Sequence, residues 1–307
     1  MIYKEIPIRA EGSLNYAKLE TYILDTPVDK IKIKKRPMII ICPGGAYQMT
    51  SYREGEPLAM HFLNQGYHAC VLRYSVAPAQ FPTQILEVGQ VMKILREHAK
   101  EWCIDTERIF VQGSSAGGHL AASYGIFWNQ DFMASKSGLT TEELKPRGIM
   151  LSYPVITSDV RYGHIESFQN LLGDKFVLCR EQMSLENQVT HTMPPTFIWH
   201  TAEDQTVPVE NSLLMTMALR RVDVPVELHI FPEGEHGLSL ATKLVEREDG
   251  SGLQNDCACW IELADVWLEK MCKVMSDDRN INNRRIKEKE NEQKTNSTYD
   301  FRRIWTE

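Results

Sequence analysis

The sequence of 307 residues lacks the features that are typical of nucleic-acid-binding, membrane-spanning and secreted proteins. Its formal net charge is -7, so it lacks the positive surface field that attracts nucleic-acid phosphates or anionic lipid. No stretch is apolar over the length that spans a bilayer. Residues 1–12 also lack the apolar core of a secretory signal. We therefore expect a cytoplasmic protein with no nucleic-acid or membrane partner.

The cysteines do not form the pattern of a disulfide framework. There are seven of them, an odd number scattered along the chain, and most have the character of small buried apolar residues. Cys257 and Cys259 lie close together, but no second pair of cysteines or histidines stands at the spacing of a zinc finger. The sequence therefore predicts no metal and no other cofactor.

What the sequence does have is an ordinary globular composition, with 43% hydrophobic and 24% charged residues. Short apolar runs of strand length alternate with longer stretches of helical periodicity. Strands alternating with helices of this length predict a mostly parallel sheet with helices on both faces. The predicted strands are 38–42, 68–74, 108–112, 148–152, 196–201 and 226–231, after a hairpin at 16–24. The predicted helices are 57–65, 84–102, 116–128 and 209–221.

Two segments depart from this alternation. Residues 154–195 are too many for a plain connection and mix polar with aromatic side chains, so we expect a small insertion near the site. Beyond Met275 the chain is rich in charged residues and asparagine, which is typical of a solvated helix or a disordered tail. We expect one domain over residues 1–275 and a polar C-terminal tail over 276–307.

One motif carries a candidate nucleophile. Gly113-Ser114-Ser115-Ala116-Gly117 has the glycine-x-serine-x-glycine pattern and lies between a predicted strand and a predicted helix, which is the context that this motif requires. Small neighbours avoid a clash at such a tight turn, and the turn presents the hydroxyl at the carboxyl end of the sheet. Ser114 competes, but only Ser115 has glycines two residues away on both sides. We assign Ser115 as the nucleophile.

A serine hydroxyl needs a base to remove its proton and an acid to orient that base. In folds with this motif the order along the chain is serine, acid, histidine. His236 follows the predicted strand 226–231, whereas His229 lies within it, so His236 is the predicted base; the alternative is an ordinary loop histidine. Asp204 follows the strand 196–201 and is the predicted acid.

Two alternatives to this acid remain open. Glu203 could replace Asp204 on chemistry alone. Asp204 could also be an acidic residue that favours the N-terminus of the helix predicted from residue 209.

Glycine-rich residues after the first predicted parallel strand are candidates for an oxyanion hole. A tetrahedral intermediate needs amide donors, and the amide of Ala116, directly after the nucleophile, is one. Pro43-Gly44-Gly45 follows the strand 38–42, and glycines there let the backbone approach a substrate oxygen. Alone this is an ordinary glycine turn. Together with candidate residues after three other strands, it favours an oxyanion-binding loop.

These motifs resemble those of bacterial α/β-hydrolases related to acetyl xylan esterases and to hormone-sensitive-lipase-like carboxylesterases. The resemblance covers Leu14 to Lys270 and rests on CPGGAY at 42–47, RYS at 73–75, QGSSAGGHL at 112–120, SYPV at 152–155, WHTAED at 199–204 and FPEGEHG at 231–237. It implies the α/β-hydrolase fold. It also implies a catalytic triad of Ser115, Asp204 and His236, with the amides of Gly45, Ala46 and Ala116 as the oxyanion hole.

The loop differs from the lipase-like relatives in having Pro43 where they carry histidine and Ala46 where they carry a third glycine. An alanine amide still donates, so the hole is expected to persist, and the difference favours the carbohydrate esterases as a guide. The resemblance then implies a serine carboxylester hydrolase that removes short acyl groups, acetyl above all, from a sugar or a similar small ester. We expect a shallow acyl pocket that ends near Tyr47 or Tyr153.

Three other functions compete with this one. A lipase-like carboxylesterase would share the triad and differ in acyl length. The turn around Ser115 also resembles that of serine oligopeptidases, but these carry a large propeller, and only about forty residues precede the core here. A non-catalytic binding protein on the same scaffold typically lacks one member of the triad, whereas all three are present here.

Overall fold

The computed structural model describes residues 1–25 and 35–273. The chain divides into two compact units, Met1–Asp265 and Val266–Glu307. The first unit contains the sheet and all the candidate site residues, and residues 266–273 of the second are helical. The predicted tail, 276–307, lies outside the described residues, and the domain boundary at 275 stays a prediction.

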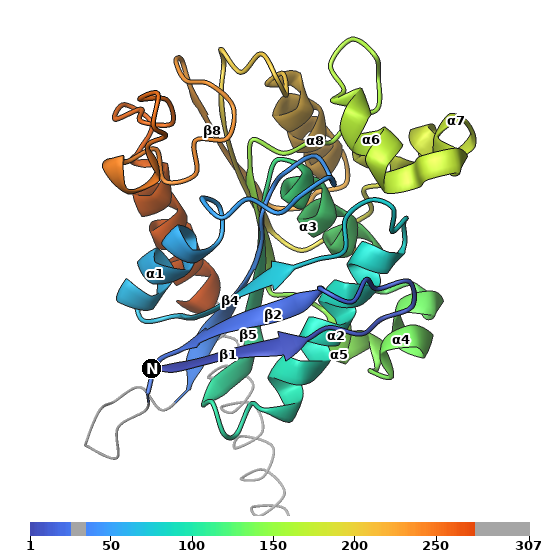
Figure 1. Ribbon diagram of the computed structural model, residues 1–307, viewed down its shortest axis with the longest axis vertical. Helices are drawn as coiled ribbons and strands as arrows, with labels where there is room; N and C mark the ends of the chain where they lie inside the picture. The colour runs from blue at the N-terminus through green and yellow to red at the C-terminus, as the bar shows by residue number, and fades with distance from the viewer. Residues whose placement is uncertain (26–34, 274–307) are drawn as a thin grey trace, which may run out of the picture. The chain divides into compact units, whose positions relative to one another are not determined.

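An eight-stranded sheet forms the centre of the first unit (Figure 1). Its strand order is β1-β2-β4-β3-β5-β6-β7-β8. The strands β1 and β2 pair antiparallel, as do β2 and β4, and all the other pairs are parallel. The strands are β1 Ile2–Pro7, β2 Lys18–Ile23, β3 Arg36–Cys42, β4 His68–Arg73, β5 Ile104–Ser114, β6 Gly148–Ser152, β7 Thr196–Thr201 and β8 Val226–Phe231.

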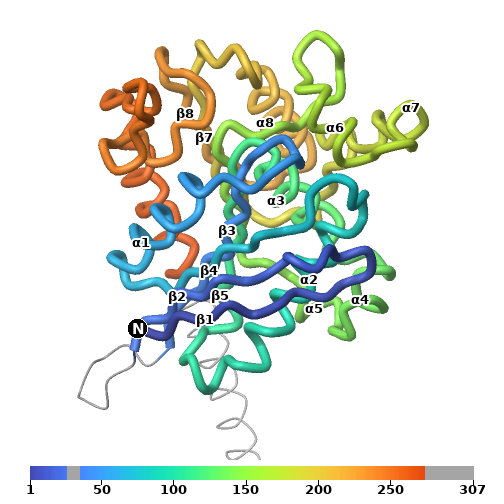
Figure 2. The backbone as a smooth tube through the Cα atoms, in the orientation of Figure 1, coloured from blue at the N-terminus to red at the C-terminus, as the bar shows by residue number. Residues whose placement is uncertain are grey.

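Helices cover both faces of this sheet, with α1 on one side and α2, α3 and α8 on the other (Figures 1 and 2). This arrangement confirms the α/β-hydrolase fold expected from the sequence. The helices are α1 Glu56–Asn64, α2 Thr83–Glu97, α3 Ala116–Phe127, α4 Asp131–Ser137, α5 Thr141–Leu144, α6 Ile165–Leu172, α7 Phe176–Cys179 and α8 Glu210–Arg221. Short 3₁₀ turns stand at Gly173–Lys175, Arg180–Met183, Leu185–Asn187 and Lys243–Val245.

The burial of the strands follows from their place in the sheet. Every residue of β4, β6 and β7 is buried, because helices or loops cover both faces of these inner strands. That is why they read as continuous apolar runs in the sequence. The edge strands β1 and β8 are mostly only half-buried or exposed. None of the described helices is long and apolar enough to cross a membrane.

Three predicted elements differ clearly from the structure, and one of them is the strand predicted over 108–112, which spans Ile104–Ser114 as β5. Residues 16–24 hold one strand, β2, and not a hairpin, because its antiparallel partner is β1, with Ile2 opposite Ile23. The helix predicted to reach residue 102 ends at Glu97. The chain then turns so that the ring of His98 stacks on the buried Trp102, with ring centroids 4.2 Å apart. The pairing of β2 with β1 joins two separate segments, so the local periodicity of residues 16–24 does not contain it.

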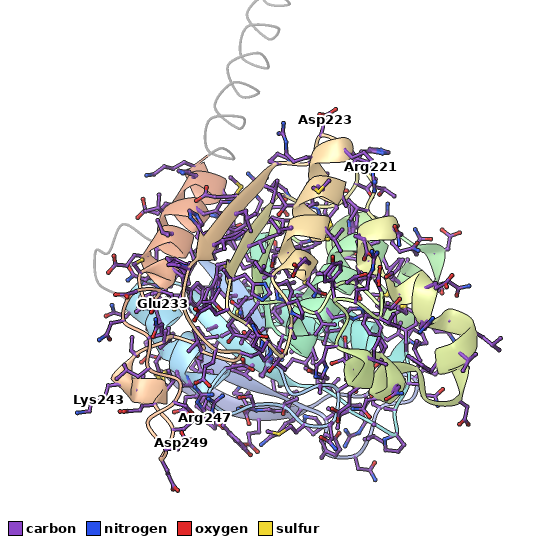
Figure 3. All side chains as sticks on the ribbon, turned by 90° about the horizontal axis from the view of Figure 1, so that it is seen from above. Arg221, Asp223, Glu233, Lys243, Arg247 and Asp249 are labelled. Carbon is purple, nitrogen blue, oxygen red and sulfur yellow. The ribbon has the colours of Figure 1, made fainter. Side chains whose placement is uncertain are left out.

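The parallel strands bring the loops that follow them to one edge of the sheet. The strands β3 and β5 are neighbours, and so are β7 and β8. In Figure 3, Asp223 precedes β8 and Arg247 follows it, and the two residues lie at opposite sides of the view. They mark the amino and the carboxyl ends of the parallel strands. The segments that carry the candidate residues follow β3, β5, β7 and β8, and therefore share the carboxyl edge.

Candidate active site

Ser115 lies in the tight turn between β5 and α3. Its φ of +54° and ψ of -121° are strained for a residue with a side chain. The surrounding backbone holds this conformation, because the amide of Ser115 donates to the carbonyl of Ser152 at 3.0 Å and its carbonyl accepts from the amides of Val155 and His119, both at 3.1 Å. The strain therefore presents the hydroxyl at the end of the sheet.

The glycines of the turn are required by close packing. A Cβ atom on Gly117 would lie 2.0 Å from the carbonyl oxygen of Cys42. A Cβ atom on Gly113 would lie 2.0 Å from the carbonyl oxygen of Gly117. Both separations are far below van der Waals contact, so α3 can approach β3 and β5 this closely only with glycine at these positions.

His236 connects the serine to a carboxylate. Its Nε2 atom lies 2.7 Å from Ser115 Oγ, and its Nδ1 atom lies 2.6 Å from Asp204 Oδ2. An ionised carboxylate only accepts hydrogen bonds, so Nδ1 carries the proton. The lone pair of Nε2 then accepts the hydroxyl hydrogen of Ser115. The structure thus brings the three sequence-predicted residues into one hydrogen-bonded chain.

The environment of Asp204 keeps its carboxylate ionised. Burial alone would raise its pKa, but hydrogen bonds from His200, His236 and the amide of Val207 outweigh burial and hold the pKa of Asp204 well below its usual range. Oδ1 accepts from the amides of Thr206 and Val207, each at 2.9 Å. The neighbouring acid, Glu203, is exposed. The hydrogen bonds that start at Ser115 lead through His236 to Asp204.

The loop after β3 presents backbone amides beside the nucleophile. A Cβ atom on Gly44 would lie only 2.8 Å from the Cβ of Ser115, so the two segments are in close contact. Gly45 and Ala46 have φ of +131° and +55°, which turns the chain sharply there. Among the described residues, the amides of Gly45, Ala46 and Ala116 donate no hydrogen bond. Gly45 and Ala46 also line the cavity beside Ser115, which makes their amides candidates for binding an oxygen there.

A cavity of about 490 Å³ opens at Ser115 and His236. Two of its lining residues, His164 and Glu166, come from the predicted insertion 154–195. Burial lowers the pKa of His164, and the neighbouring His236 lowers it further, so the neutral form of His164 is favoured. The lining is mostly polar or charged, and consists of Gly45, Ala46, Gln48, Met49, Ser51, Arg53, Glu54, Ser115, His164, Glu166, Thr206, His236, Gly237 and Arg247.

Tyr47 and Tyr153, near which the acyl pocket was expected to end, are both buried, and neither is among the residues that line this cavity. The hydroxyl of Tyr47 lies 3.0 Å from Nδ1 of His119. Burial lowers the pKa of His119 to about 4, so this imidazole is neutral and accepts from the tyrosine. Tyr153 donates to Glu54 and packs edge-on against His236, with ring centroids 5.1 Å apart. Both tyrosines support the site from outside the cavity.

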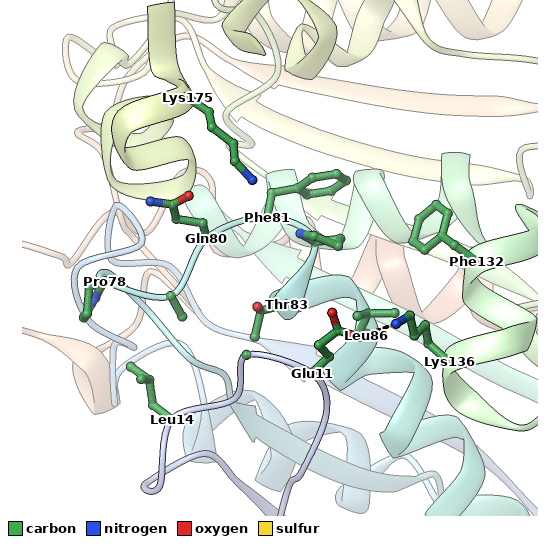
Figure 4. Close-up of a pocket in the computed structure, with 13 residues that line it drawn as sticks. Glu11, Leu14, Pro78, Gln80, Phe81, Thr83, Leu86, Phe132, Lys136 and Lys175 are labelled. Carbon is green, nitrogen blue, oxygen red and sulfur yellow. Dashed lines mark hydrogen bonds and ion pairs between the residues drawn. The ribbon is translucent and has the colours of Figure 1, made fainter. Parts of the chain in front are cut away.

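A second cavity, of about 560 Å³, is lined by apolar and charged residues (Figure 4). Phe81 and Phe132 contribute rings to it, and Lys136 pairs with Glu11 at its edge. Its lining contains a hydroxyl at Thr83 but no histidine that could act as its base. Nucleophile and base coincide in the first cavity, which we take as the candidate active site. Among residues 1–25 and 35–273, no group of three or more metal-ligating side chains is placed to hold a metal ion.

Several lining residues escaped the sequence analysis. Arg53, Glu54 and His164 lie in no motif with a chemistry of its own, and nothing local in the sequence singles them out. Arg247 lies in the loop after β8, near Lys243 and Asp249 in Figure 3. Only the folding of distant segments onto one edge of the sheet brings these side chains to the serine.

The arrangement has the parts that nucleophilic acyl transfer requires. A hydroxyl contacts an imidazole, the imidazole contacts an ionised carboxylate, and the glycine loop after β3 lies against Ser115. Such a set can form and break an acyl-serine bond and stabilise the oxyanion in between.

Comparison with known proteins gives consistent matches. Residues 24–219 match the BD-FAE family model. The chain is 38% identical over 214 residues to endo-1,4-beta-xylanase B of Butyrivibrio fibrisolvens, which is 67% of this chain and 33% of that protein. It is 32% identical over 210 residues to the acetylxylan esterase of Xylanibacter ruminicola, which is 66% of this chain and 41% of that protein. The matches thus span less than half the length of either relative.

A solved structure matches over nearly its whole length. It is the acetyl ester-xyloside bifunctional hydrolase from Caldicellulosiruptor lactoaceticus, with 35% sequence identity and a TM-score of 0.71. The match covers 87% of this chain and 96% of that one.

Proposed function

Since the chain belongs to the BD-FAE family of α/β-hydrolases, we propose that it is a serine carboxylester hydrolase. Ser115 is the nucleophile, His236 the general base and Asp204 the acid that orients the histidine. The observation that carries the proposal is the continuous hydrogen-bonded chain from Asp204 through His236 to Ser115, with distances of 2.6 and 2.7 Å. This series of hydrogen bonds ends at Ser115, which lines a cavity that is open to a substrate.

Acylation begins when Ser115 Oγ attacks the carbonyl carbon of the ester. The hydroxyl proton passes to Nε2 of His236, and Asp204 stabilises the imidazolium that forms. The carbonyl oxygen becomes an oxyanion and accepts hydrogen bonds from the amides of Gly45, Ala46 and Ala116. Collapse of this intermediate breaks the bond to the alcohol oxygen, which takes the proton from His236.

Deacylation repeats these steps with water in place of the alcohol. His236 removes a proton from the water, whose oxygen attacks the acyl-serine carbonyl. The same amides hold the second oxyanion. The carboxylic acid then leaves, and Ser115 recovers its proton from His236, so the enzyme returns to its starting state.

The substrate we propose is a short acyl ester, acetyl above all, on a sugar or a similar polar alcohol. Two observations support this choice. A relative and a solved structure with similar sequences are named for acetylxylan and for acetyl esters. The cavity lining is mostly polar or charged, with Met49 as its one large apolar side chain, which suits a hydroxyl-rich alcohol better than a long alkyl chain.

Ser115→Ala tests the proposal directly. Loss of the attacking atom should reduce turnover of nitrophenyl acetate by up to roughly six powers of ten, with an unchanged unfolding temperature because the hydroxyl contributes little packing. Ser135→Ala, at an exposed serine of α4, is the control and should keep wild-type activity. A Ser115→Ala enzyme that retained more than about a tenth of the wild-type rate would place the nucleophile elsewhere.

Asp204→Asn should lower turnover by about three to four orders of magnitude, because an amide no longer holds His236 in the required tautomer. Glu203→Gln, one residue earlier and exposed, should stay within about tenfold of wild type. Steady-state rates of both purified variants check the assignment. The reverse ranking would move the acid to Glu203.

The pH profile follows from the states of the base and the acid. Turnover should rise with pH through a single ionisation, because the imidazole accepts the serine proton only when it is neutral. Asp204 should add no second step, since its pKa is depressed and its carboxylate is already ionised where the imidazole loses its proton. Catalytic efficiency measured across acidic to alkaline buffers checks this, and a flat profile contradicts a histidine base.

The acyl preference separates a short-chain esterase from a lipase-like enzyme. Nitrophenyl acetate should exceed nitrophenyl octanoate by about tenfold or more in kcat/KM, because each methylene gains up to about 0.8 kcal/mol only where an apolar wall receives it. Measurements on acetate, butyrate and octanoate esters, beside acetylated xylo-oligosaccharides, give the trend. Efficiency that climbs steadily to octanoate would favour a lipase-like carboxylesterase.

A further inference from the structure

Glu54 is a buried carboxylate between two loops: residues 43–46 after β3, called the oxyanion loop, and residues 232–247 after β8, called the histidine loop. Only 4% of its surface is exposed. Its Oε2 atom accepts a hydrogen bond from the amide of Gly44 at 2.8 Å, and its Oε1 atom accepts one from the hydroxyl of Tyr153 at 2.7 Å. One side chain thus joins two segments that follow different strands.

Through its hydrogen bond with Gly44, Glu54 is connected to the two residues whose amides are proposed to bind the oxyanion. Gly44 immediately precedes Gly45 and Ala46, which line the cavity. A Cβ atom on Gly44 would lie 2.7 Å from Oε2 of Glu54 and 2.8 Å from the Cβ of Ser115. The carboxylate therefore holds the backbone one residue before the oxyanion donors, in close contact with the nucleophile.

Through its hydrogen bond with Tyr153, Glu54 is also connected to His236. The ring of Tyr153 packs edge-on against the imidazole of His236, and its hydroxyl also accepts from the amide of Ser239 at 2.8 Å. Burial raises the pKa of Tyr153 well above its usual range, so the phenol stays protonated and donates to the carboxylate. The position of the imidazole thus depends on a tyrosine that Glu54 holds.

The neighbouring residue fixes the same stretch to the histidine loop. Arg53 donates from Nη1 to the carbonyl of Gly237 at 3.0 Å and from Nε to that of Val245 at 2.7 Å. In return, the hydroxyl of Ser239 donates to the carbonyl of Arg53 at 2.6 Å. The backbone on which Glu54 stands is therefore held against the histidine loop independently of its own carboxylate.

We propose that Glu54 is a positioning residue, which aligns the oxyanion amides of Gly45 and Ala46 with Ser115 and His236 through Gly44 and Tyr153. The inference rests on the proposed esterase function. Its carboxylate accepts from two donors and moves no proton in the reaction. The two hydrogen bonds fix the geometry of the segments on either side of Glu54.

Glu54→Gln isolates this role because it keeps the shape of the side chain. The amide oxygen can accept from Gly44, but the NH₂ group then faces the hydroxyl of Tyr153, which already accepts from the amide of Ser239 and would have to turn its own proton away. We expect kcat for nitrophenyl acetate to fall about 10- to 100-fold, less than the largest losses on deleting an oxyanion donor, with KM within about twofold of wild type. Glu56→Gln, two residues later on the exposed surface of α1, is the matched control and should behave as wild type.

A trifluoromethyl ketone provides the readout that a general loss of structure would not reproduce. Such a ketone forms a tetrahedral adduct with the serine, and the oxygen of the adduct occupies the oxyanion site. Its inhibition constant should rise for Glu54→Gln by about the factor that kcat falls, while the unfolding midpoint stays near that of wild type. Tyr153→Phe removes one of the two hydrogen bonds and should show a smaller change in the same direction, which keeps the test decisive if Glu54→Gln does not fold.

The outcomes separate this inference from the proposed function. Wild-type kcat and ketone affinity in Glu54→Gln, beside an inactive Ser115→Ala, would overturn the positioning role alone. A raised KM with unchanged kcat and ketone affinity would make Glu54 a substrate-binding residue instead. A wild-type enzyme without ester turnover would overturn the proposed function itself, and the positioning role with it.

Discussion

The hydrogen bond between Asp204 and His236 is the interaction on which the rest of the site depends. It works only if a carboxylate deep in the protein stays ionised, and burial opposes that. The fold compensates with two backbone amides on one oxygen and two imidazoles on the other. The segment after β7 is therefore shaped around one charge, and that charge fixes which nitrogen of His236 is free to face the serine.

The strained turn at Ser115 illustrates how the sheet stabilises an unfavourable conformation. A positive φ at a serine costs of order 1–3 kcal/mol, and three backbone hydrogen bonds to β6, the segment after it and α3 hold the turn in place. The glycines on either side let α3 pack directly against β3 and β5. These hydrogen bonds and this close packing keep the backbone of Ser115 from relaxing to a more favourable conformation.

The candidate active site joins segments that are far apart in the sequence, and each segment is fixed by more than one contact. The oxyanion loop is held by Glu54 on one side and by the side chain of Asn170, which donates to the carbonyl of Ala46 at 2.9 Å, on the other. The histidine loop is held by Arg53 and Tyr153. Amides aimed at an oxyanion gain their effect from being fixed before the substrate arrives, so this bracing is part of how the site would act.

The sequence by itself determined the inner strands, the turn at Ser115 and the segments that carry Asp204 and His236, because each of these is a local pattern. An apolar run buried on both faces, a serine flanked by small residues after a strand, and a polar loop at a strand's end are all legible within about ten residues. The parallel topology then requires such loops to meet at one edge. The contacts among Ser115, His236 and Asp204 follow from that geometry.

Only the tertiary structure decided where the first strand pairs and which residues surround Ser115, His236 and Asp204. Tyr47 and Tyr153 were expected to line the pocket, yet they support its wall. Glu54, in a segment without a motif, lies between the two functional loops. The physical reason is that these features are set by hydrogen bonds and packing between segments separated by tens to hundreds of residues, which no local pattern of side chains encodes.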